Sequence, residues 1–114
     1  MPRVLIVDDD LEVADTLREI LEQAGHRVQT ATSFEEGKRL LVDAPPDVLV
    51  TDIRLGRYNG LQLAVIRPAA TALVVISGHP DSTLEAETAR LGGRFILKPV
   101  TARDLIEAIQ RLPT

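Results

Sequence analysis

The chain has 114 residues, a formal charge of −4, 45% hydrophobic side chains and no cysteine, which predicts one globular domain over residues 1–114 and excludes disulfides and thiolate chemistry. No apolar run approaches the roughly 18 residues that a membrane helix needs. The N-terminus lacks the pattern of a signal peptide, and Lys and Arg do not cluster as they do in proteins that bind nucleic acids. We therefore expect a cytoplasmic protein that contacts neither membranes nor nucleic acids directly.

Short apolar runs alternate with amphipathic stretches along the whole chain. The runs predict strands, which in chain order are residues 4–7, 27–31, 47–51, 72–76 and 94–97. Apolar side chains at helical spacing predict a helix after each strand. In chain order, these helices begin at or just after Asp10, Ser33, Gly60, Asp81 and Thr101, and they end near Gly25, Pro45, Pro68, Gly92 and Leu112. Ser33 and Glu36 have the spacing of a capping box, and Asp10 is interpreted as a helix cap.

Five successive strand-helix units favour a parallel sheet joined by crossover helices. Four strands are unbroken apolar runs, as is typical of strands buried on both faces, whereas residues 27–31 alternate and are placed at an edge. The strand order 2-1-3-4-5 satisfies this placement. We therefore predict an α/β, doubly wound, flavodoxin-like fold, with its topological switch point between the first and third strands. Ligands bind such sheets beyond the carboxyl ends of the strands at that point.

Polar side chains follow four of the five expected strands. They are Asp8, Asp9 and Asp10 after the first strand, Asp52 after the third, Ser77 after the fourth, and Lys98 with Pro99 after the fifth. Carboxylates gathered at one rim of the sheet repel each other, and a divalent cation would remove that repulsion. Oxygen ligands favour Mg²⁺, Mn²⁺ or Ca²⁺ over zinc. An aspartate can also attack phosphorus, and a metal and a lysine would stabilise the transferring phosphoryl group.

The segments VLIVDDD, VLVTDIRL, GLQL, VVISG and FILKP resemble, in this order and over essentially the whole chain, the receiver domain of response regulators in two-component signalling. The resemblance implies that Asp52 accepts a phosphoryl group from a phosphohistidine on a sensor histidine kinase or phosphotransfer protein. It also implies a Mg²⁺ site in which Asp9 and Asp52 are ligands and Asp8 acts directly or through water. The backbone carbonyl of Arg54 would complete this site.

The same resemblance implies how the phosphorylated state is read. Ser77 and Lys98 would contact the phosphate, Phe95 would be an aromatic switch residue, and Pro99 would follow a cis peptide bond. Phosphorylation would change the surface made by the last two helices and the strand between them, and dimerisation through this surface is common in the family. The change would be read by a downstream protein or by an output domain beyond Thr114.

Two of the departures of the chain from the family pattern concern the stretch between the third and fourth expected strands. Gly56 stands where proline is common, which should loosen that loop. The stretch from Gly60 to Ser77 is a few residues short for the family, so the third helix or the loop after it should be truncated. Neither departure affects the acidic residues, Ser77 or Lys98.

Two alternative functions stay open from the sequence. The first is a phosphatase that resembles the haloacid dehalogenase group, since Asp8 and Asp10, Ser77 and Lys98 fit that pattern. That pattern needs a further pair of acids, however, and it leaves Asp52 unexplained. The second is a binding module of the same fold that works without phosphorylation. Turnover of a phosphate ester would identify the phosphatase, and binding that needs no phosphate would identify the module.

Overall fold

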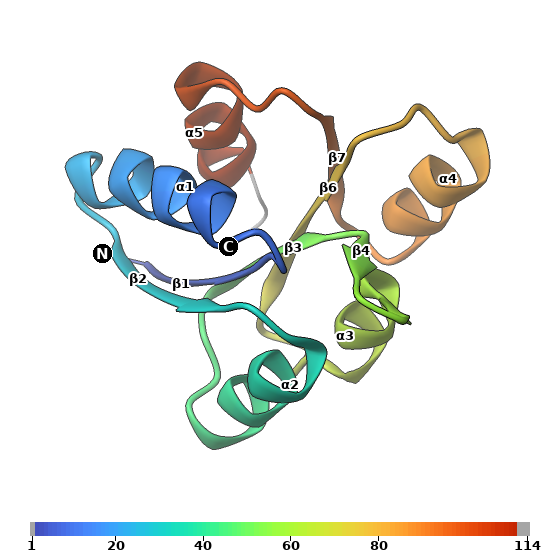
Figure 1. The fold of residues 1–114 in the computed structure, drawn as a ribbon, viewed down its shortest axis with the longest axis horizontal. Helices are drawn as coiled ribbons and strands as arrows, with labels where there is room; N and C mark the ends of the chain where they lie inside the picture. The colour runs from blue at the N-terminus through green and yellow to red at the C-terminus, as the bar shows by residue number, and fades with distance from the viewer. Residues whose placement is uncertain (1, 112–114) are drawn as a thin grey trace.

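The computed structural model describes residues 2–111. The strands of the main sheet are β1 (Arg3–Val7), β2 (Arg27–Ala31), β3 (Val48–Asp52), β6 (Ala72–Ser77) and β7 (Arg94–Leu97). The helices are α1 (Leu11–Gln23), α2 (Phe34–Asp43), α3 (Gly60–Ile66), α4 (Ser82–Arg90) and α5 (Ala102–Gln110). The main sheet is parallel and has the order β2-β1-β3-β6-β7, which confirms the predicted fold (Figure 1).

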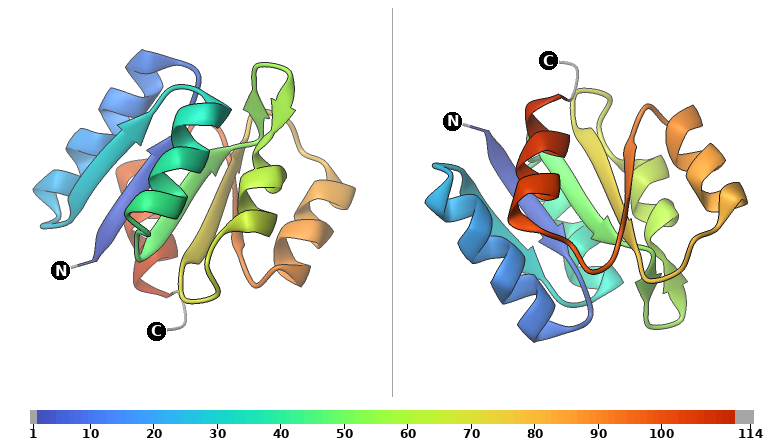
Figure 2. Two further views of the ribbon diagram at one scale, coloured as in Figure 1. Left: turned by 90° about the horizontal axis from the view of Figure 1, so that it is seen from below. Right: turned by 90° about the horizontal axis from the view of Figure 1, so that it is seen from above.

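Helices cover both faces of the sheet (Figure 2). Alternate residues of a strand point to opposite faces, so Val4 and Ile6 pack under α1 and α5 while Leu5 and Val7 pack against the other helices. The first core cluster joins β1, β3 and β6 to α1 and α5, and the second joins the same strands to α2 and α3. These two apolar layers hold the carboxyl ends of the central strands at a common rim.

β2 and β7 both lie at an edge of the sheet, but their sequence patterns differ. β2 alternates between exposed and half-buried residues before its buried last residue, as expected for an edge. β7 reads as an apolar run, yet Arg94 and Leu97 are exposed and its two middle residues are half-buried. The expectation that residues 94–97 are buried on both faces is therefore wrong. The physical reason is that β7 has a neighbouring strand on one side alone.

Side-chain caps begin the helices largely as expected. The carboxylate of Asp10 accepts backbone N–H groups at the start of α1, and Asp81 and Thr101 cap α4 and α5 in the same way. Ser33 caps α2, but the Glu36 carboxylate accepts the N–H of Thr32 instead of that of Ser33, so the predicted capping box is incomplete. Leu112, the expected end of the last helix, lies outside the described residues.

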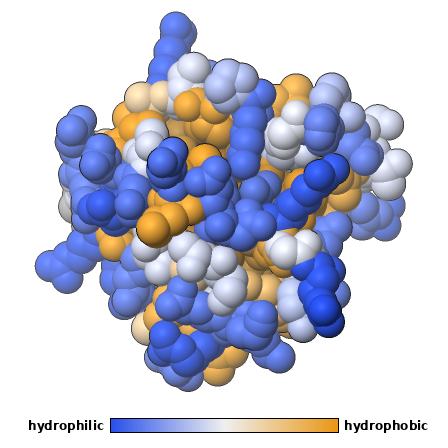
Figure 3. All heavy atoms as spheres, in the orientation of Figure 1, coloured by the Kyte–Doolittle hydropathy of each residue, from blue (hydrophilic) through white to orange (hydrophobic). Residues whose placement is uncertain are grey.

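The region after β3 is compact. α3 has seven residues, and the expected truncation relative to the family stays a prediction. Arg67 follows it and donates to the carbonyl oxygens of Ala64, Thr71 and Leu91 at 2.6–2.8 Å, which ties the end of α3 to the end of α4. Between residues 2 and 111 we find no helix that is both long enough and apolar enough to cross a bilayer. The face drawn in Figure 3 is largely hydrophilic, with apolar atoms visible between the polar side chains.

Candidate functional site

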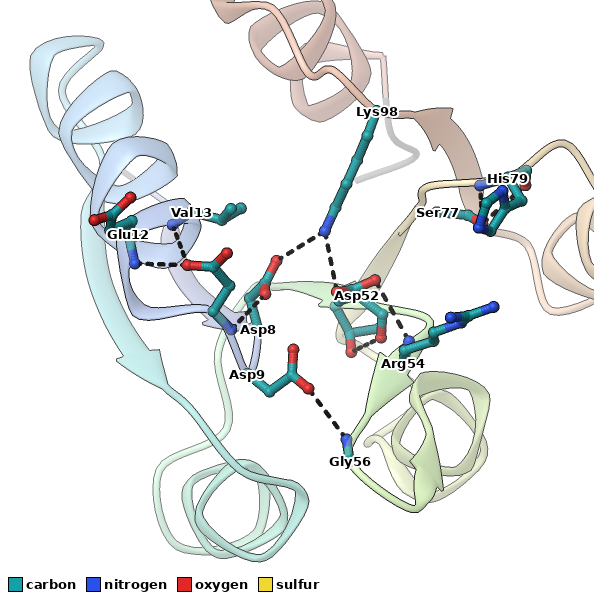
Figure 4. A network of polar contacts seen from close by, with 12 residues as sticks. Asp8, Asp9, Glu12, Val13, Asp52, Arg54, Gly56, Ser77, His79 and Lys98 are labelled. Atoms are coloured by element: carbon teal, nitrogen blue, oxygen red, sulfur yellow. Dashed lines mark hydrogen bonds and ion pairs between the residues drawn. The ribbon is translucent and has the colours of Figure 1, made fainter.

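Three carboxylates meet at the carboxyl ends of β1 and β3. The two strands are parallel neighbours in which Val7 lies opposite Thr51, so the residues that follow emerge side by side at one rim. One oxygen from each of Asp8, Asp9 and Asp52 lies within 4.8 Å of the others, and Figure 4 shows the three side chains converging. The predicted gathering of these three acids is therefore present in the structure.

Asp8 is the most buried member of this cluster. Its side chain is 1% exposed, and Oδ1 accepts the N–H of Asp10 at 2.9 Å. Oδ2 has no hydrogen-bond partner within the described part of the chain, because the Nζ of Lys98 at 3.6 Å is close enough for an ion pair but not for a hydrogen bond. Burial raises the pKa of Asp8, and the negative charge of Asp52 adds to this rise.

Lys98 reaches the cluster from the end of β7. Its Nζ donates to Oδ2 of Asp52 at 3.1 Å, and the peptide bond between Lys98 and Pro99 is cis. Burial lowers the pKa of Lys98, but its hydrogen bond to Asp52 and the charges of Asp52 and Asp8 outweigh burial, so the pKa is raised overall. The ammonium stays protonated at neutral pH and offsets one of the three negative charges. The cluster therefore keeps an excess of negative charge that a divalent cation would neutralise.

Backbone N–H groups that follow β3 donate to the carboxylates of Asp9 and Asp52. Gly56 donates its N–H to Oδ2 of Asp9 at 3.3 Å, and Arg54 donates its N–H to Oδ1 of Asp52 at 3.4 Å. The side chain of Arg54 is exposed. The metal-binding role of the Arg54 carbonyl stays a prediction.

Ser77 and Phe95 are engaged with other partners than the carboxylates. Ser77 is 2% exposed, and its Oγ donates to the carbonyl of His79 at 2.9 Å and accepts the His79 N–H at 3.2 Å. Figure 4 shows this hydroxyl engaged with its own loop, on the far side of Asp52 from Asp8. Phe95 is half-buried against the apolar cluster between the sheet and α2 and α3, and it lines a surface cavity of about 380 Å³ beside α5.

The loop after β3 differs from the expectation drawn from Gly56. Residues 54–59 form an antiparallel hairpin of β4 (Arg54–Leu55) and β5 (Tyr58–Asn59), joined by Gly56 and Arg57. Gly56 has a φ of +63°, which proline cannot adopt, and it donates an N–H that proline lacks. The glycine therefore forms the turn of a hairpin beside Asp9, and the expected loosening of the loop stays a prediction.

Two residues near β3 make close contacts that the sequence pattern did not predict. Gly60 begins α3 so close to β3 that an added Cβ would lie 2.1 Å from the carbonyl oxygen of Asp52. Tyr58 stacks on Phe34 of α2, with ring centroids 4.3 Å apart. Gly60 was expected at the start of a helix, but the stack joins residues 24 positions apart and leaves no local pattern in the sequence.

Comparison with known proteins agrees with this geometry. Residues 4–110 match the model of the response regulator receiver domain. The positive alginate biosynthesis regulatory protein of Pseudomonas aeruginosa is 34% identical over 114 residues, which cover 95% of this chain and 46% of that protein. The acid tolerance regulatory protein ActR of Sinorhizobium medicae is 31% identical over 114 residues, which cover 96% of this chain and 59% of that protein. The chain thus spans about half the length of these relatives.

Solved structures give the same result. A CheY-like response regulator receiver domain protein from Methanospirillum hungatei superposes with a TM-score of 0.87 at 30% identity, covering 96% of this chain and 91% of that one. A receiver domain protein from Clostridium thermocellum has a TM-score of 0.88 at 28% identity, with coverages of 98% and 94%. The chain therefore belongs to the receiver domain family of response regulators, the signalling modules of two-component systems.

Proposed function

We propose that this receiver domain, residues 1–114, is a phosphorylation-dependent switch whose phosphoryl acceptor is Asp52. The observation that carries the proposal is the convergence of Asp8, Asp9 and Asp52 within 4.8 Å, with Lys98 hydrogen-bonded to Asp52. An acceptor carboxylate needs a cation on each side of the incoming phosphoryl group. Lys98 supplies one cation, and the two other carboxylates are suited to hold the second.

The donor set fits Mg²⁺. It consists of hard oxygen ligands, it carries excess negative charge, and it includes the buried Oδ2 of Asp8, which lacks a hydrogen-bond partner among residues 2–111. We assign Asp9 and Asp52 as ligands, Asp8 as a direct or water-mediated one, and the carbonyl of Arg54 as a further oxygen. When bound, Mg²⁺ would neutralise negative charge on the phosphoryl oxygens.

The remaining chemistry belongs to side chains of this chain. One carboxylate oxygen of Asp52 forms a bond to phosphorus while the bond between phosphorus and the imidazole nitrogen of the donor phosphohistidine breaks. The electron pair of that bond stays on the nitrogen, which takes up a proton from solvent. Lys98 then pairs with a phosphoryl oxygen instead of with Asp52. Its raised pKa keeps it charged for this role at neutral pH.

Ser77 and Phe95 are the proposed links to the output surface. Ser77 would leave its bonds to His79 and donate its hydroxyl to the phosphoryl group, and Phe95 would move toward the space that is vacated. The surface of α4, β7 and α5 would change with them, because Phe95 lies on β7 and lines the cavity beside α5. Phosphorylation-dependent partner binding should be lost in Ser77→Ala, and full retention in this variant would refute this coupling.

The proposed partners follow from the family. A sensor histidine kinase or phosphotransfer protein donates the phosphoryl group, and the output is a downstream protein or an attached output domain. Dimerisation in the phosphorylated state would use the surface of α4, β7 and α5. The relatives are about twice as long as this chain, which supports an output domain in those proteins.

The direct test is intact mass after incubation with acetyl phosphate and Mg²⁺. We expect a gain of one phosphoryl group in the wild type, and no gain in Asp52→Ala or after chelation of the metal. Asp10→Asn is the matched control, because Asp10 caps α1 and asparagine caps equally well. No gain in the wild type with Mg²⁺ bound would instead favour the phosphorylation-independent binding module. Catalytic turnover of a phosphate ester would favour the phosphatase.

A further inference from the structure

The hairpin of β4 and β5 lies between the acceptor strand β3 and α3, and its turn is next to the carboxylate cluster. Leu55 is 2% exposed and anchors one strand of the hairpin in the core of the α2 and α3 face. At the turn, the N–H of Gly56 donates to Oδ2 of Asp9 at 3.3 Å, as Figure 4 shows. The position of this turn therefore determines where the Gly56 N–H can donate to the Asp9 carboxylate.

The turn itself depends on Gly56. Two residues join the strands, Gly56 has a φ of +63°, and Arg57 does not have a positive φ. A two-residue hairpin with the left-handed conformation at its first turn position alone is the type II′ arrangement, which prefers glycine there. The N–H that meets Asp9 is thus presented by a defined backbone conformation.

A second contact joins the hairpin to a distant element. Tyr58, in β5, stacks on Phe34, the first residue of α2, with ring centroids 4.3 Å apart and an interplanar angle of 14°. The start of α2 is held in turn by the Ser33 cap. Residues of the hairpin and of the start of α2 line a shallow cavity of about 370 Å³ that opens beside Asp9. Because Tyr58 is 37% exposed, the stack does not belong to the buried core.

We infer that the stack of Phe34 and Tyr58 is a positioning device for the cation site. It holds the hairpin against α2, so that the Gly56 N–H keeps the Asp9 carboxylate turned toward Asp8 and Asp52. Phe34 and Tyr58 are positioning residues that touch neither the cation nor the phosphoryl group. Groups that orient metal ligands affect metal affinity without binding the metal. This inference rests on the proposed function, because it requires that Asp9 binds a cation.

The test is Mg²⁺ affinity measured by calorimetry on the full chain without a phosphoryl donor. We expect Tyr58→Ala to bind Mg²⁺ about two- to tenfold more weakly, since the loss of an aromatic pair corresponds to that range. Tyr58→Phe keeps the ring and should bind Mg²⁺ as the wild type does. Val42→Ala is the matched control, because Val42 is 66% exposed and lies near the other end of α2.

A second readout uses the natural fluorophore. Tyr58 is the single tyrosine of the chain, which has no tryptophan, so its emission reports on the hairpin. Mg²⁺ should change this emission in the wild type with the midpoint found by calorimetry. In Phe34→Leu the midpoint should move to higher Mg²⁺ concentration.

Each outcome decides a different claim. Equal Mg²⁺ affinity of Tyr58→Ala and the wild type would overturn the inference while leaving the proposed function intact, and so would an unshifted midpoint in Phe34→Leu. A weak affinity in Tyr58→Phe as well would assign the effect to the hydroxyl and also overturn it. Absence of Mg²⁺ binding in the wild type would overturn the proposed function itself.

Discussion

Replacing Asp8 with asparagine should stabilise the metal-free protein. Asp8 is buried beside two other carboxylates, so its neutralisation removes the cost of burying a charge and, in addition, the repulsion inside the cluster. Within 4.8 Å and at an effective dielectric constant of about 20, each carboxylate pair repels by at least about 3.5 kcal/mol, and the ion pair with Lys98 at 3.6 Å attracts by about 4.6 kcal/mol. Two repulsions exceed one attraction, but solvent screens the exposed Asp9. We therefore expect a net gain of about 1–2 kcal/mol in the free energy of unfolding.

The assay is thermal unfolding followed by circular dichroism at neutral pH, with EDTA and with Mg²⁺. In EDTA, Asp8→Asn should raise Tm by about 4–8 °C, from roughly 4 °C for each kcal/mol in a domain of this size. Mg²⁺ should raise the Tm of the wild type, because it binds the folded state, and it should raise the Tm of Asp8→Asn less. Asp10→Asn makes the same change of charge at an exposed cap and should leave Tm nearly unchanged.

The pH dependence gives an independent check of the same reasoning. The pKa of Asp8 is raised above its ordinary value of 3.8, so the folded state holds the proton more tightly than the unfolded state does. Ionisation of Asp8 then costs stability as the pH rises from 3.8 through the folded-state pKa. The stability difference between Asp8→Asn and the wild type should be smallest below pH 3.8, should widen as the pH rises towards the folded-state pKa of Asp8, and should then level off. A lower Tm of Asp8→Asn in EDTA at neutral pH would refute the net repulsion inferred for the cluster.

Two further substitutions test the packing next to β3 and after α3. Gly60→Ala should lower the free energy of unfolding by about 3 kcal/mol in urea titrations, because the new Cβ would lie 2.1 Å from the carbonyl oxygen of Asp52. Gly78→Ala is the control, because Gly78 has open space around it and its substitution should cost far less. Equal losses of unfolding free energy in the two variants would contradict this packing argument. Arg67→Ala should cost about 2–3 kcal/mol in the same titrations, because Arg67 donates to three backbone carbonyls. Arg103→Ala is its control, since the Arg103 side chain is 86% exposed, and a similar loss in both variants would show that the Arg67 contacts add nothing.

Much of the candidate site was predictable because its residues follow strands directly. Asp8, Asp52 and Lys98 each stand next to a strand that local hydropathy identifies, and parallel neighbours end at the same rim of the sheet. The predicted strand order therefore brings these side chains near each other. Asp10 was likewise interpreted as a cap from its position before an amphipathic stretch, and it caps α1.

Other features did not follow from the local sequence pattern. β7 has an apolar sequence but an exposed edge, since burial depends on how many neighbouring strands there are. The sequence does not indicate that Ser77 bonds to His79 instead of to the cluster, because a hydroxyl can rotate between partners of similar energy. Gly56 suggested a loose loop, whereas the structure has a hairpin there, whose turn donates to Asp9 and whose Tyr58 stacks on Phe34.

The amino-acid sequence by itself determined the alternation of strands and helices, the family, and the set of polar residues at the carboxyl ends of the strands. These features follow from periodicity and from residues adjacent in the chain, which act over a few positions. The tertiary structure alone decided the 3.1 Å contact between Lys98 and Asp52, the burial of Asp8, and the stack that joins α2 to the hairpin. Those contacts bring together residues tens of positions apart, and their geometry depends on how the helices pack on the sheet.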